Sequence, residues 1–131
     1  MTTNEGLSDA ERWEQGTTVR RRILGDEHVD RTIANTTDLT ADFQDFITRV
    51  AWGDIWSRPG LDRRSRSIAV LTSLIAHGDH EEFALHVRAA LRNGLSVTEI
   101  RELILQSAVY SGIPAANTAF RIASEVLADE E

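Results

Sequence analysis

Apolar residues recur at intervals of three and four along nearly the whole chain, and nowhere do they alternate convincingly with polar residues. This spacing places apolar side chains on one face of an α-helix, whereas alternation would indicate a strand. We therefore predict an all-α fold. The chain has 131 residues, the size of one ordinary domain, and its 41% of hydrophobic residues suffice for a single core. We expect one domain, residues 1–131, built as a bundle of about six to seven helices.

Capping patterns and glycines mark where the helices begin and end. Ser8 with Glu11, and Ser96 with Glu99, form capping boxes. Gly25 is expected to end the first helix in a left-handed conformation. The predicted helices are Asp9–Leu24, His28–Ala34 as a helical turn or two, Ala41–Trp56, Asp62–Ala76, Glu81–Asn93, Val97–Tyr110 and Pro114–Leu127.

Three apolar faces bear on packing. The first helix is expected to bury Trp13, Val19 and Ile23. The helix that follows Thr40 is expected to bury its positions of helical spacing, which are Phe43, Phe46, Ile47, Val50 and Ala51. The stretch Ile68–Ala76 is apolar nearly all round, so it must be buried on most sides. A chain this short can hardly cover such a helix alone, and we therefore predict a homo-oligomer.

Charge and hydropathy argue against two classes of partner. The chain has 21 acidic and 14 basic residues, and its formal net charge of −7 repels a polyanion, so we expect no nucleic-acid partner. The longest run without a charge, Ile68–His77, is about half of the roughly 20 residues that a transmembrane helix needs. No charged and then apolar leader opens the chain. We therefore expect no membrane partner and a cytoplasmic location.

The sequence lacks two types of amino acid, and their absence excludes several catalytic mechanisms. The chain has no Cys, which excludes thiol nucleophiles, thiol redox chemistry, iron–sulfur clusters and cysteine-ligated zinc. It has no Lys, which excludes a Schiff-base lysine. Every basic side chain is therefore Arg, whose planar guanidinium group suits the recognition of carboxylates.

The densest group of candidate catalytic residues lies between His77 and His86. Asp79, Glu82 and His86 share one helix face, with Glu82 one turn before His86, so that a carboxylate and an imidazole can share a proton. The alternative is an exposed helix start, where acidic residues favour the positive end of the helix dipole. His77, Asp79 and His80 offer atoms to a metal, but the HExxH pattern of a zincin is absent, and we predict no metal site.

Arginines form a second group of candidates. Arg20–Arg22 suit the C-terminal end of the first helix, where cations complement the dipole. Arg63, Arg64 and Arg66 lie at the start of their helix and gain no such benefit, which hints at a function. These arginines either bind a small polycarboxylate or form salt bridges with the numerous acidic residues.

Two tryptophans precede another arginine. Trp52 and Trp56 are four residues apart on one helix face, just before Arg58. They either form an apolar wall beside a bound carboxylate or pack in the core. The turn Arg58–Gly60 that follows them is a candidate lip of the site.

Four stretches carry a resemblance that spans nearly the whole chain. They are Arg20–Arg31 (RRRILGDEHVDR), Ile47–Leu61 (ITRVAWGDIWSRPGL), Leu85–Gly94 (LHVRAALRNG) and Val109–Phe120 (VYSGIPAANTAF). With them the chain resembles the family of 4-carboxymuconolactone decarboxylases, which act in the protocatechuate branch of the β-ketoadipate pathway. A wider superfamily, which includes alkylhydroperoxidase D-type reductases, is similar only from about Asp62 onward. The resemblance implies an all-α, alkylhydroperoxidase D-like fold that assembles into homotrimers or homohexamers.

The peroxidase-type relatives carry a CxxCxxxH motif at the start of the equivalent helix. When the histidine of that motif is aligned with His86, its two cysteines fall at Asp79 and Glu82. The acidic residue of their proton relay falls at Ser67. Only His86 carries over, so we exclude a thiol peroxidase activity.

The family resemblance implies decarboxylation of a small dicarboxylate lactone, 4-carboxymuconolactone, to 3-oxoadipate enol-lactone and CO2. The charge left by CO2 is delocalised through the ring to the lactone oxygen, so the substrate is its own electron sink. We therefore expect no cofactor and no metal. The enzyme has to bind the dicarboxylate, stabilise the developing oxyanion and protonate the ring α-carbon.

The implied roles fall on named residues of this chain. His86 is the expected proton donor or oxyanion partner, and Glu82 is expected to orient it. The expected substrate-binding residues are His28, Trp52, Trp56, Arg58, Arg66 and His80. Two alternatives stay open, namely another lactone decarboxylase or an isomerase on the same fold, and a non-catalytic oligomeric binding protein.

Overall fold

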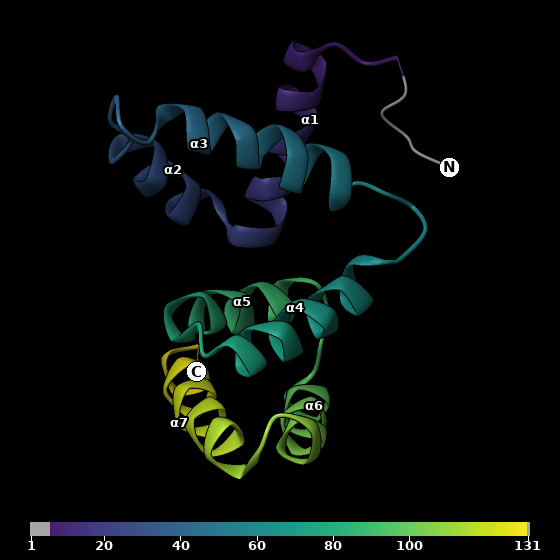
Figure 1. The fold of residues 1–131 in the computed structure, drawn as a ribbon, viewed down its shortest axis with the longest axis vertical. Coiled ribbons are helices and arrows are strands. Elements are labelled where there is room, and N and C mark those ends of the chain that lie inside the picture. Colours follow the sequence, from purple (N-terminus) through teal and green to yellow (C-terminus); the bar gives the residue numbers. More distant parts are fainter. Residues whose placement is uncertain (1–5, 131) are drawn as a thin grey trace. The chain divides into compact units, whose positions relative to one another are not determined.

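The computed structural model describes residues 6–130, and these residues form helices and connecting turns without a strand. In chain order the helices are α1 (Asp9–Leu24), α2 (Asp26–Ala34), α3 (Ala41–Phe46), the π-helix η1 (Ile47–Ile55), α4 (Arg63–His77), α5 (His80–Arg92), α6 (Val97–Tyr110) and α7 (Ile113–Asp129) (Figure 1). The prediction of an all-α fold is therefore confirmed. No helix in the described part of the chain is long and apolar enough to cross a membrane.

The described residues divide into two compact units between Asp62 and Arg63. We call residues 6–62 the N-terminal unit and residues 63–130 the C-terminal unit. The expectation of one domain over residues 1–131 stays a prediction.

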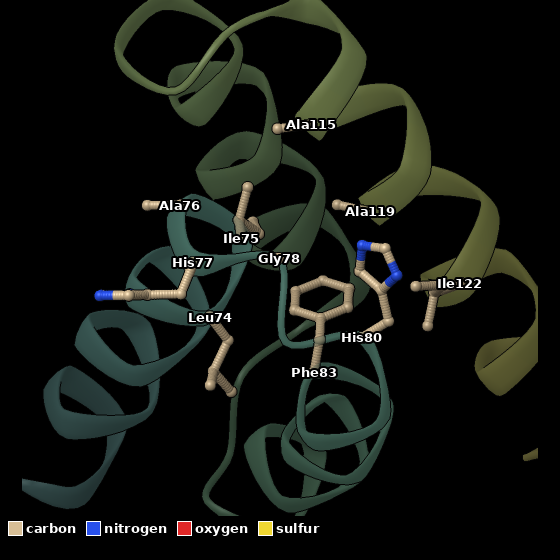
Figure 2. A pocket seen from close by; sticks show the side chains of 10 residues that line it. All are labelled: Leu74, Ile75, Ala76, His77, Gly78, His80, Phe83, Ala115, Ala119 and Ile122. Atoms are coloured by element: carbon tan, nitrogen blue, oxygen red, sulfur yellow. The ribbon is translucent and has the colours of Figure 1, made fainter.

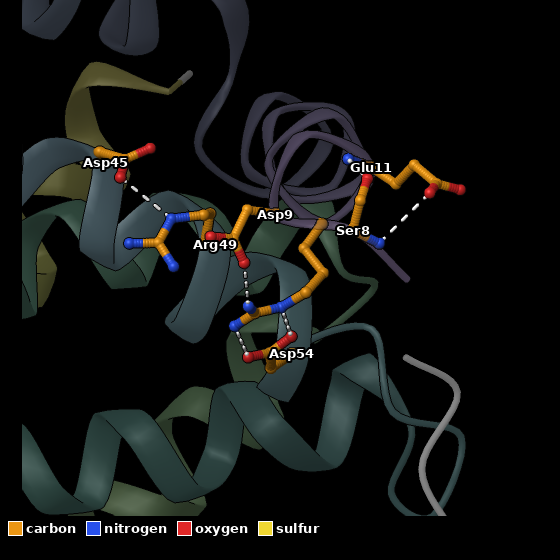
Figure 3. Close-up of polar contacts among 7 residues, drawn as sticks. Ser8, Asp9, Glu11, Asp45, Arg49 and Asp54 are labelled. Atoms are coloured by element: carbon orange, nitrogen blue, oxygen red, sulfur yellow. Dashed lines mark hydrogen bonds and ion pairs between the residues drawn. The ribbon is translucent and has the colours of Figure 1, made fainter. Parts of the chain in front are cut away.

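Helix ends with a capping box lie where the sequence predicts them. The Ser8 hydroxyl accepts a hydrogen bond from the Glu11 backbone N–H at 3.1 Å, and the Glu11 carboxylate accepts one from the Ser8 N–H (Figure 3). Ser96 and Glu99 form the same pair of bonds. The bounds of α1 and α6 are the predicted ones, and so are the end of α2 at Ala34 and the start of α3 at Ala41. The other helix starts, and the ends of α4, α5 and α7, differ from the predicted ones by one or two residues. Gly25 has a φ of 89° but a ψ of 148°, so it is not in the left-handed helical conformation that we expected.

The predicted single helix Ala41–Trp56 is wrong in its second half. After α3 the chain continues as the π-helix η1, whose bonds reach five residues back, as from the Trp56 N–H to the Ala51 carbonyl at 3.0 Å. Over so few residues, the spacing of apolar positions does not separate a π-helix from an α-helix. The expected buried face is also wrong in part, because Phe43 is 60% exposed and Phe46 is 52% exposed. Thr48, Trp52 and Gly53 are buried instead.

The core of the N-terminal unit is the crossing of α1 and η1, which make its most extensive contact. The two backbones approach at Gly16 and Gly53. A Cβ atom at Gly16 would lie 1.9 Å from the Thr48 carbonyl oxygen, and one at Gly53 would lie 2.6 Å from the Arg12 carbonyl oxygen. Neither position has room for a side chain.

Polar side chains flank this crossing (Figure 3). The Arg12 guanidinium donates to both carboxylate oxygens of Asp54, with 2.9 Å between Nε and Oδ1, and also to Asp9. These bonds, that to Asp54 above all, raise the pKa of Arg12. On α1, Val19 and Ile23 are buried as predicted, whereas Trp13 is half exposed.

The C-terminal unit is built around an apolar core. Helix α4 packs against α5, and α7 packs against both α5 and α6. The largest fully buried side chains of the core are those of Phe83, Leu71, Ile100, Ile104 and Val87.

Helix α4 is buried along one side only. Ser67, Leu71 and Ile75 face the core, while Ile68 is 37% exposed and Ala69 is exposed. The expectation that a second subunit covers this exposed side stays a prediction.

Candidate active site

His86 and Glu82 lie one turn apart on α5, as the sequence predicts. His86 shares the buried face of the amphipathic helix with Phe83, Val87 and Ala90. Its Nε2 atom lies 3.8 Å from the Glu82 Oε2 atom, and the Glu82 side chain is 62% exposed. The pair therefore combines a buried imidazole with a carboxylate that reaches solvent.

The alternative of an exposed helix start fits only part of this group. Asp79 is the N-cap residue of α5, is exposed, and makes no capping hydrogen bond with its side chain. His86 is buried, with 8% of its surface exposed, so it is not part of a solvated surface. A proton donor in this position is shielded from bulk water, whereas Glu82 is not.

His80 begins α5 and lines a hollow of about 200 Å³ in the C-terminal unit (Figure 2). Its imidazole lies beside Phe83 and Ile122, whereas the His77 side chain extends away from that ring. His77 Nδ1 is 2.8 Å from the carbonyl oxygen of Ser73 on its own helix. His86 does not line this hollow, so the structure does not place His80 with His86 there. Across the described residues, no group of three or more His, Asp or Glu side chains could hold a metal ion.

The arginines at the start of α4 have different surroundings. Arg64 donates to the Glu99 carboxylate and, from Nε, to the Gly94 carbonyl at 3.3 Å. The Arg64 bond, followed by that from the Ser96 backbone, lowers the pKa of Glu99. The salt-bridge interpretation is therefore confirmed for Arg64. Arg66, the predicted substrate-binding residue, is half-buried on the same helix.

Ser67 follows Arg66 and is nearly completely buried, with 1% of its surface exposed. Its hydroxyl accepts a hydrogen bond of 2.8 Å from the Asn93 side-chain amide. The sequence resemblance aligns the acidic relay residue of the peroxidase-type relatives with this position. Here the position holds a neutral hydroxyl that links α4 to the end of α5.

The other predicted site residues belong to the N-terminal unit. Trp52 and Trp56 are stacked, with 5.2 Å between ring centroids and 25° between ring planes. Both are buried, which fits the packing interpretation, and their role as a pocket wall stays a prediction. His28 on α2 and Arg58 after η1 are half-buried.

Arg20 is the residue whose environment the sequence analysis missed. It was expected to lie at the end of α1 as a dipole-complementing cation, but it is turned inward and is only 8% exposed. Its Nη1 donates to Gln44 Oε1 at 3.1 Å and to Thr48 Oγ1 at 3.3 Å. Arg21 instead donates to Asp30 and Asp26, and these bonds raise its pKa.

A signal for this burial was present in the sequence. Arg20 lies four residues after Gly16 and three before Ile23, so it shares the buried face of α1 with both. The run of three arginines concealed this spacing.

Several known proteins are similar to this chain in sequence. A 4-carboxymuconolactone decarboxylase from Acinetobacter baylyi is 45% identical over 123 residues, which cover 94% of this chain and 92% of that protein. A nitrosuccinic acid decarboxylase from Metarhizium robertsii is 39% identical over 117 residues, covering 89% of this chain and 82% of that protein. A 4-carboxymuconolactone decarboxylase sequence from Pseudomonas putida is 44% identical over 48 residues, covering 37% of this chain and all of that sequence.

The family described as "Carboxymuconolactone decarboxylase family" matches this chain over residues 41–125. This match begins at α3 and runs into α7, and it includes the Glu82–His86 pair. By its sequence, its helices and its relatives, the chain belongs to the carboxymuconolactone decarboxylase family.

Proposed function

We propose that this protein is a carboxy-lyase that converts 4-carboxymuconolactone to 3-oxoadipate enol-lactone and CO2. The observation that carries this function is the 45% identity, over 94% of the chain, to a relative with that name. We further propose that the reaction needs no metal and no organic cofactor, because its substrate accepts the electrons itself.

The chemistry assigns three tasks to the protein. The bond between the ring γ-carbon and the departing carboxylate breaks, and its electron pair is delocalised through the ring double bond to the lactone carbonyl oxygen. A proton then adds to the ring α-carbon and gives the enol-lactone. The protein has to hold the substrate, stabilise the oxyanion and supply that proton.

We assign the proton transfer to His86. An imidazole can be protonated or neutral near neutral pH, which suits a group that gives up a proton once per turnover. The burial of His86 supports this role, and so does the distance of 3.8 Å to Glu82, whose carboxylate can exchange protons with solvent. Glu82 is a positioning residue in this proposal.

Substrate binding is proposed for His28, Trp52, Trp56, Arg58, Arg66 and His80. The arginines suit the acetate arm of the substrate, because guanidinium groups recognise carboxylates. The carboxylate that leaves is better placed against an apolar wall such as an indole ring, since a cation there would stabilise the ground state and oppose its conversion to neutral CO2.

A homotrimer or homohexamer is part of the proposal. Several large apolar side chains of α6 and α7 are exposed in the single chain, and Val109, Tyr110 and Ile113 are 78%, 84% and 76% exposed. Such a patch is typical of a contact between subunits. Sedimentation equilibrium would test this, and a monomer at micromolar concentration would contradict it. The cytoplasmic location and the lack of nucleic-acid and membrane partners also stay predictions.

A second candidate function is the decarboxylation of a different acid whose own structure accepts the electrons. The identity of 39% to a nitrosuccinic acid decarboxylase favours this alternative. A panel of electron-accepting carboxylic acids that includes nitrosuccinic acid separates the two candidates by their kcat/KM values.

The deciding experiment follows CO2 release and enol-lactone formation from 4-carboxymuconolactone in the presence of a chelator. We expect turnover by the unmutated protein, and a loss of about a hundredfold or more in His86→Gln. The matched control is His77→Gln, since His77 is exposed and bonded within its own helix.

Each result of this experiment has a separate meaning. Absence of turnover by the unmutated protein would overturn the substrate assignment. Equal activity of His86→Gln and His77→Gln would keep the reaction but remove His86 from the proton transfer.

A further inference from the structure

The N-terminal unit contains a cavity of about 400 Å³ between α1, α2, α3 and the first residues of η1. This volume lies within the range of about 300–1,000 Å³ that is usual for pockets that bind small molecules. Neither His86 nor Glu82 lines it, and neither tryptophan of the Trp52–Trp56 pair does. The proposed reaction therefore leaves this cavity without a role.

Arg20 gives one wall of the cavity a positive charge. Its guanidinium is held by the side chains of Gln44 and Thr48, which both line the cavity. The Thr48 hydroxyl in turn donates its proton to the Gln44 backbone carbonyl at 2.7 Å, so this proton is not available to a ligand. This wall therefore offers the positive charge of Arg20, which suits an anionic group.

The remaining walls are apolar or use their hydrogen-bonding groups within the helices. Val29, Ile33 and the Trp13 ring supply apolar surface. The hydroxyls of Thr32 and Thr36 donate to backbone carbonyls one helical turn earlier, at 3.1 and 2.7 Å. These walls suit a flat apolar body rather than a second polar group.

Asp45 adds a negative charge to the lining. Its carboxylate accepts a hydrogen bond of 3.0 Å from Arg49, and its side chain is 49% exposed. Positive and negative side chains thus both line the cavity. A second carboxylate on a ligand in this cavity would share the cavity with the Asp45 carboxylate, and like charges repel.

We propose that this cavity binds a small organic acid that has one carboxylate and a flat apolar body, and that Arg20 receives the carboxylate. The inference concerns binding only and goes beyond the proposed decarboxylation. It can be tested without any turnover, so its failure and that of the proposed reaction are distinguishable.

The test uses benzoate as the probe and the full chain labelled with ¹⁵N. We expect saturable shifts of the Trp13 indole N–H signal and of the backbone signals of Arg20 and Gln44. Benzamide has the same ring without the charge, and isophthalate has a second carboxylate. We expect benzamide to bind at least about tenfold more weakly than benzoate, since a hydrogen bond to a charged partner contributes roughly that factor. We expect isophthalate to bind more weakly than benzoate as well, because Asp45 repels a second carboxylate.

Two variants and two matched controls locate the site. Arg20→Gln removes the cation, and Thr17→Leu fills the cavity from a half-buried position in its lining. Arg31→Gln and Thr18→Leu make the same changes at exposed positions outside the lining. We expect Arg20→Gln to lose at least about tenfold in benzoate affinity, the factor of a charge-assisted bond. We expect Thr17→Leu to lose affinity because its larger side chain occupies the space of the ligand, and we expect no change in the controls.

The proposal would be overturned by three results. One is no saturation up to about 10 mM benzoate, a concentration beyond useful affinity. Another is equal binding of benzoate and benzamide, and the third is undiminished binding by Thr17→Leu, which does not depend on the folding of Arg20→Gln. Equal or tighter binding of isophthalate would overturn the preference for a single carboxylate.

Discussion

The two units of this chain are stabilised in different ways. In the C-terminal unit, four helices bury a continuous apolar core that includes Leu71, Phe83 and Ile104. In the N-terminal unit, two backbones meet at Gly16 and Gly53, an ion pair joins Arg12 to Asp54, and Arg20 is buried among polar side chains. An apolar core tolerates the replacement of one apolar side chain by another of similar size. The contacts of the N-terminal unit, in contrast, each require a particular residue.

The largest expected effect is that of Phe83→Ala in the apolar core of the C-terminal unit. Phe83 is 2% exposed, and truncation of a buried phenylalanine typically costs about 3–5 kcal/mol in the free energy of unfolding. Phe43→Ala is the matched change in the N-terminal unit, where the ring is 60% exposed, and we expect less than about 1 kcal/mol. Urea denaturation measures both. Equal losses would mean that Phe43 is buried in solution.

Gly16→Ala is expected to have the next largest effect. Its Cβ would lie 1.9 Å from the Thr48 carbonyl oxygen, so the helices have to separate, at a cost of about 3 kcal/mol. Gly60→Ala is the control, because no atom lies within 4 Å of a Cβ there, and we expect a change within about 0.5 kcal/mol. If the two variants unfold at the same urea concentration, the close approach of α1 and η1 is wrong.

Arg12→Lys tests the ion pair beside this crossing. A lysine keeps the charge but cannot donate to both oxygens of Asp54 with a planar fork, so we expect a lower melting temperature. The decrease should be smaller than that of Gly16→Ala. Arg31→Lys, which changes an exposed pair with Glu27, should leave the melting temperature unchanged. A larger decrease in Arg31→Lys would contradict the prediction.

The smallest expected effects concern the two capping boxes. Hydrogen bonds lower the pKa of Glu11, chiefly from Ser8, and that of Glu99, chiefly from Arg64. A carboxylate with a lowered pKa stabilises the fold at neutral pH, and this stabilisation is lost as pH falls from its ordinary value of 4.5 through the folded-state pKa.

We therefore expect Glu99→Gln and Glu11→Gln to be less stable than the unmutated protein at pH 7, with the difference disappearing in acid. The loss should be larger for Glu99, which has Arg64 as an additional partner. Thermal unfolding between pH 7 and about pH 3 measures it. A deficit that persists unchanged in acid would mean that the carboxylate charge has no part in it.

Sequence patterns predicted those structural features that depend on contacts between residues close together in the chain. The capping boxes at Ser8 and Ser96 located the starts of α1 and α6, because their partners lie three residues away. The same reasoning brought Glu82 next to His86. The helices of the C-terminal unit followed from apolar spacing, which is the property that a helical bundle requires.

Features that depend on distant parts of the chain were not predicted. The π-helix η1 is packed against α1, and Gln15 of α1 donates to the Gly53 carbonyl at 3.1 Å. The spacing of Arg20 from Gly16 and Ile23 indicated that Arg20 is buried, but its hydrogen-bond partners Gln44 and Thr48 lie on other helices, and no local pattern connects them to it. For the same reason, the cavity beside Arg20 was not foreseen.

The glycine crossing has a consequence for the order of folding. It joins parts of the chain that are 38 residues apart, as the Gln15–Gly53 bond shows, whereas the pairs α4–α5 and α6–α7 are consecutive helices. Closing the longer loop costs entropy before any contact compensates for it. We therefore expect the helix pairs of the C-terminal unit to form early and the crossing to close late. Stopped-flow kinetics should then show that Gly16→Ala accelerates unfolding and leaves the rate of folding nearly unchanged.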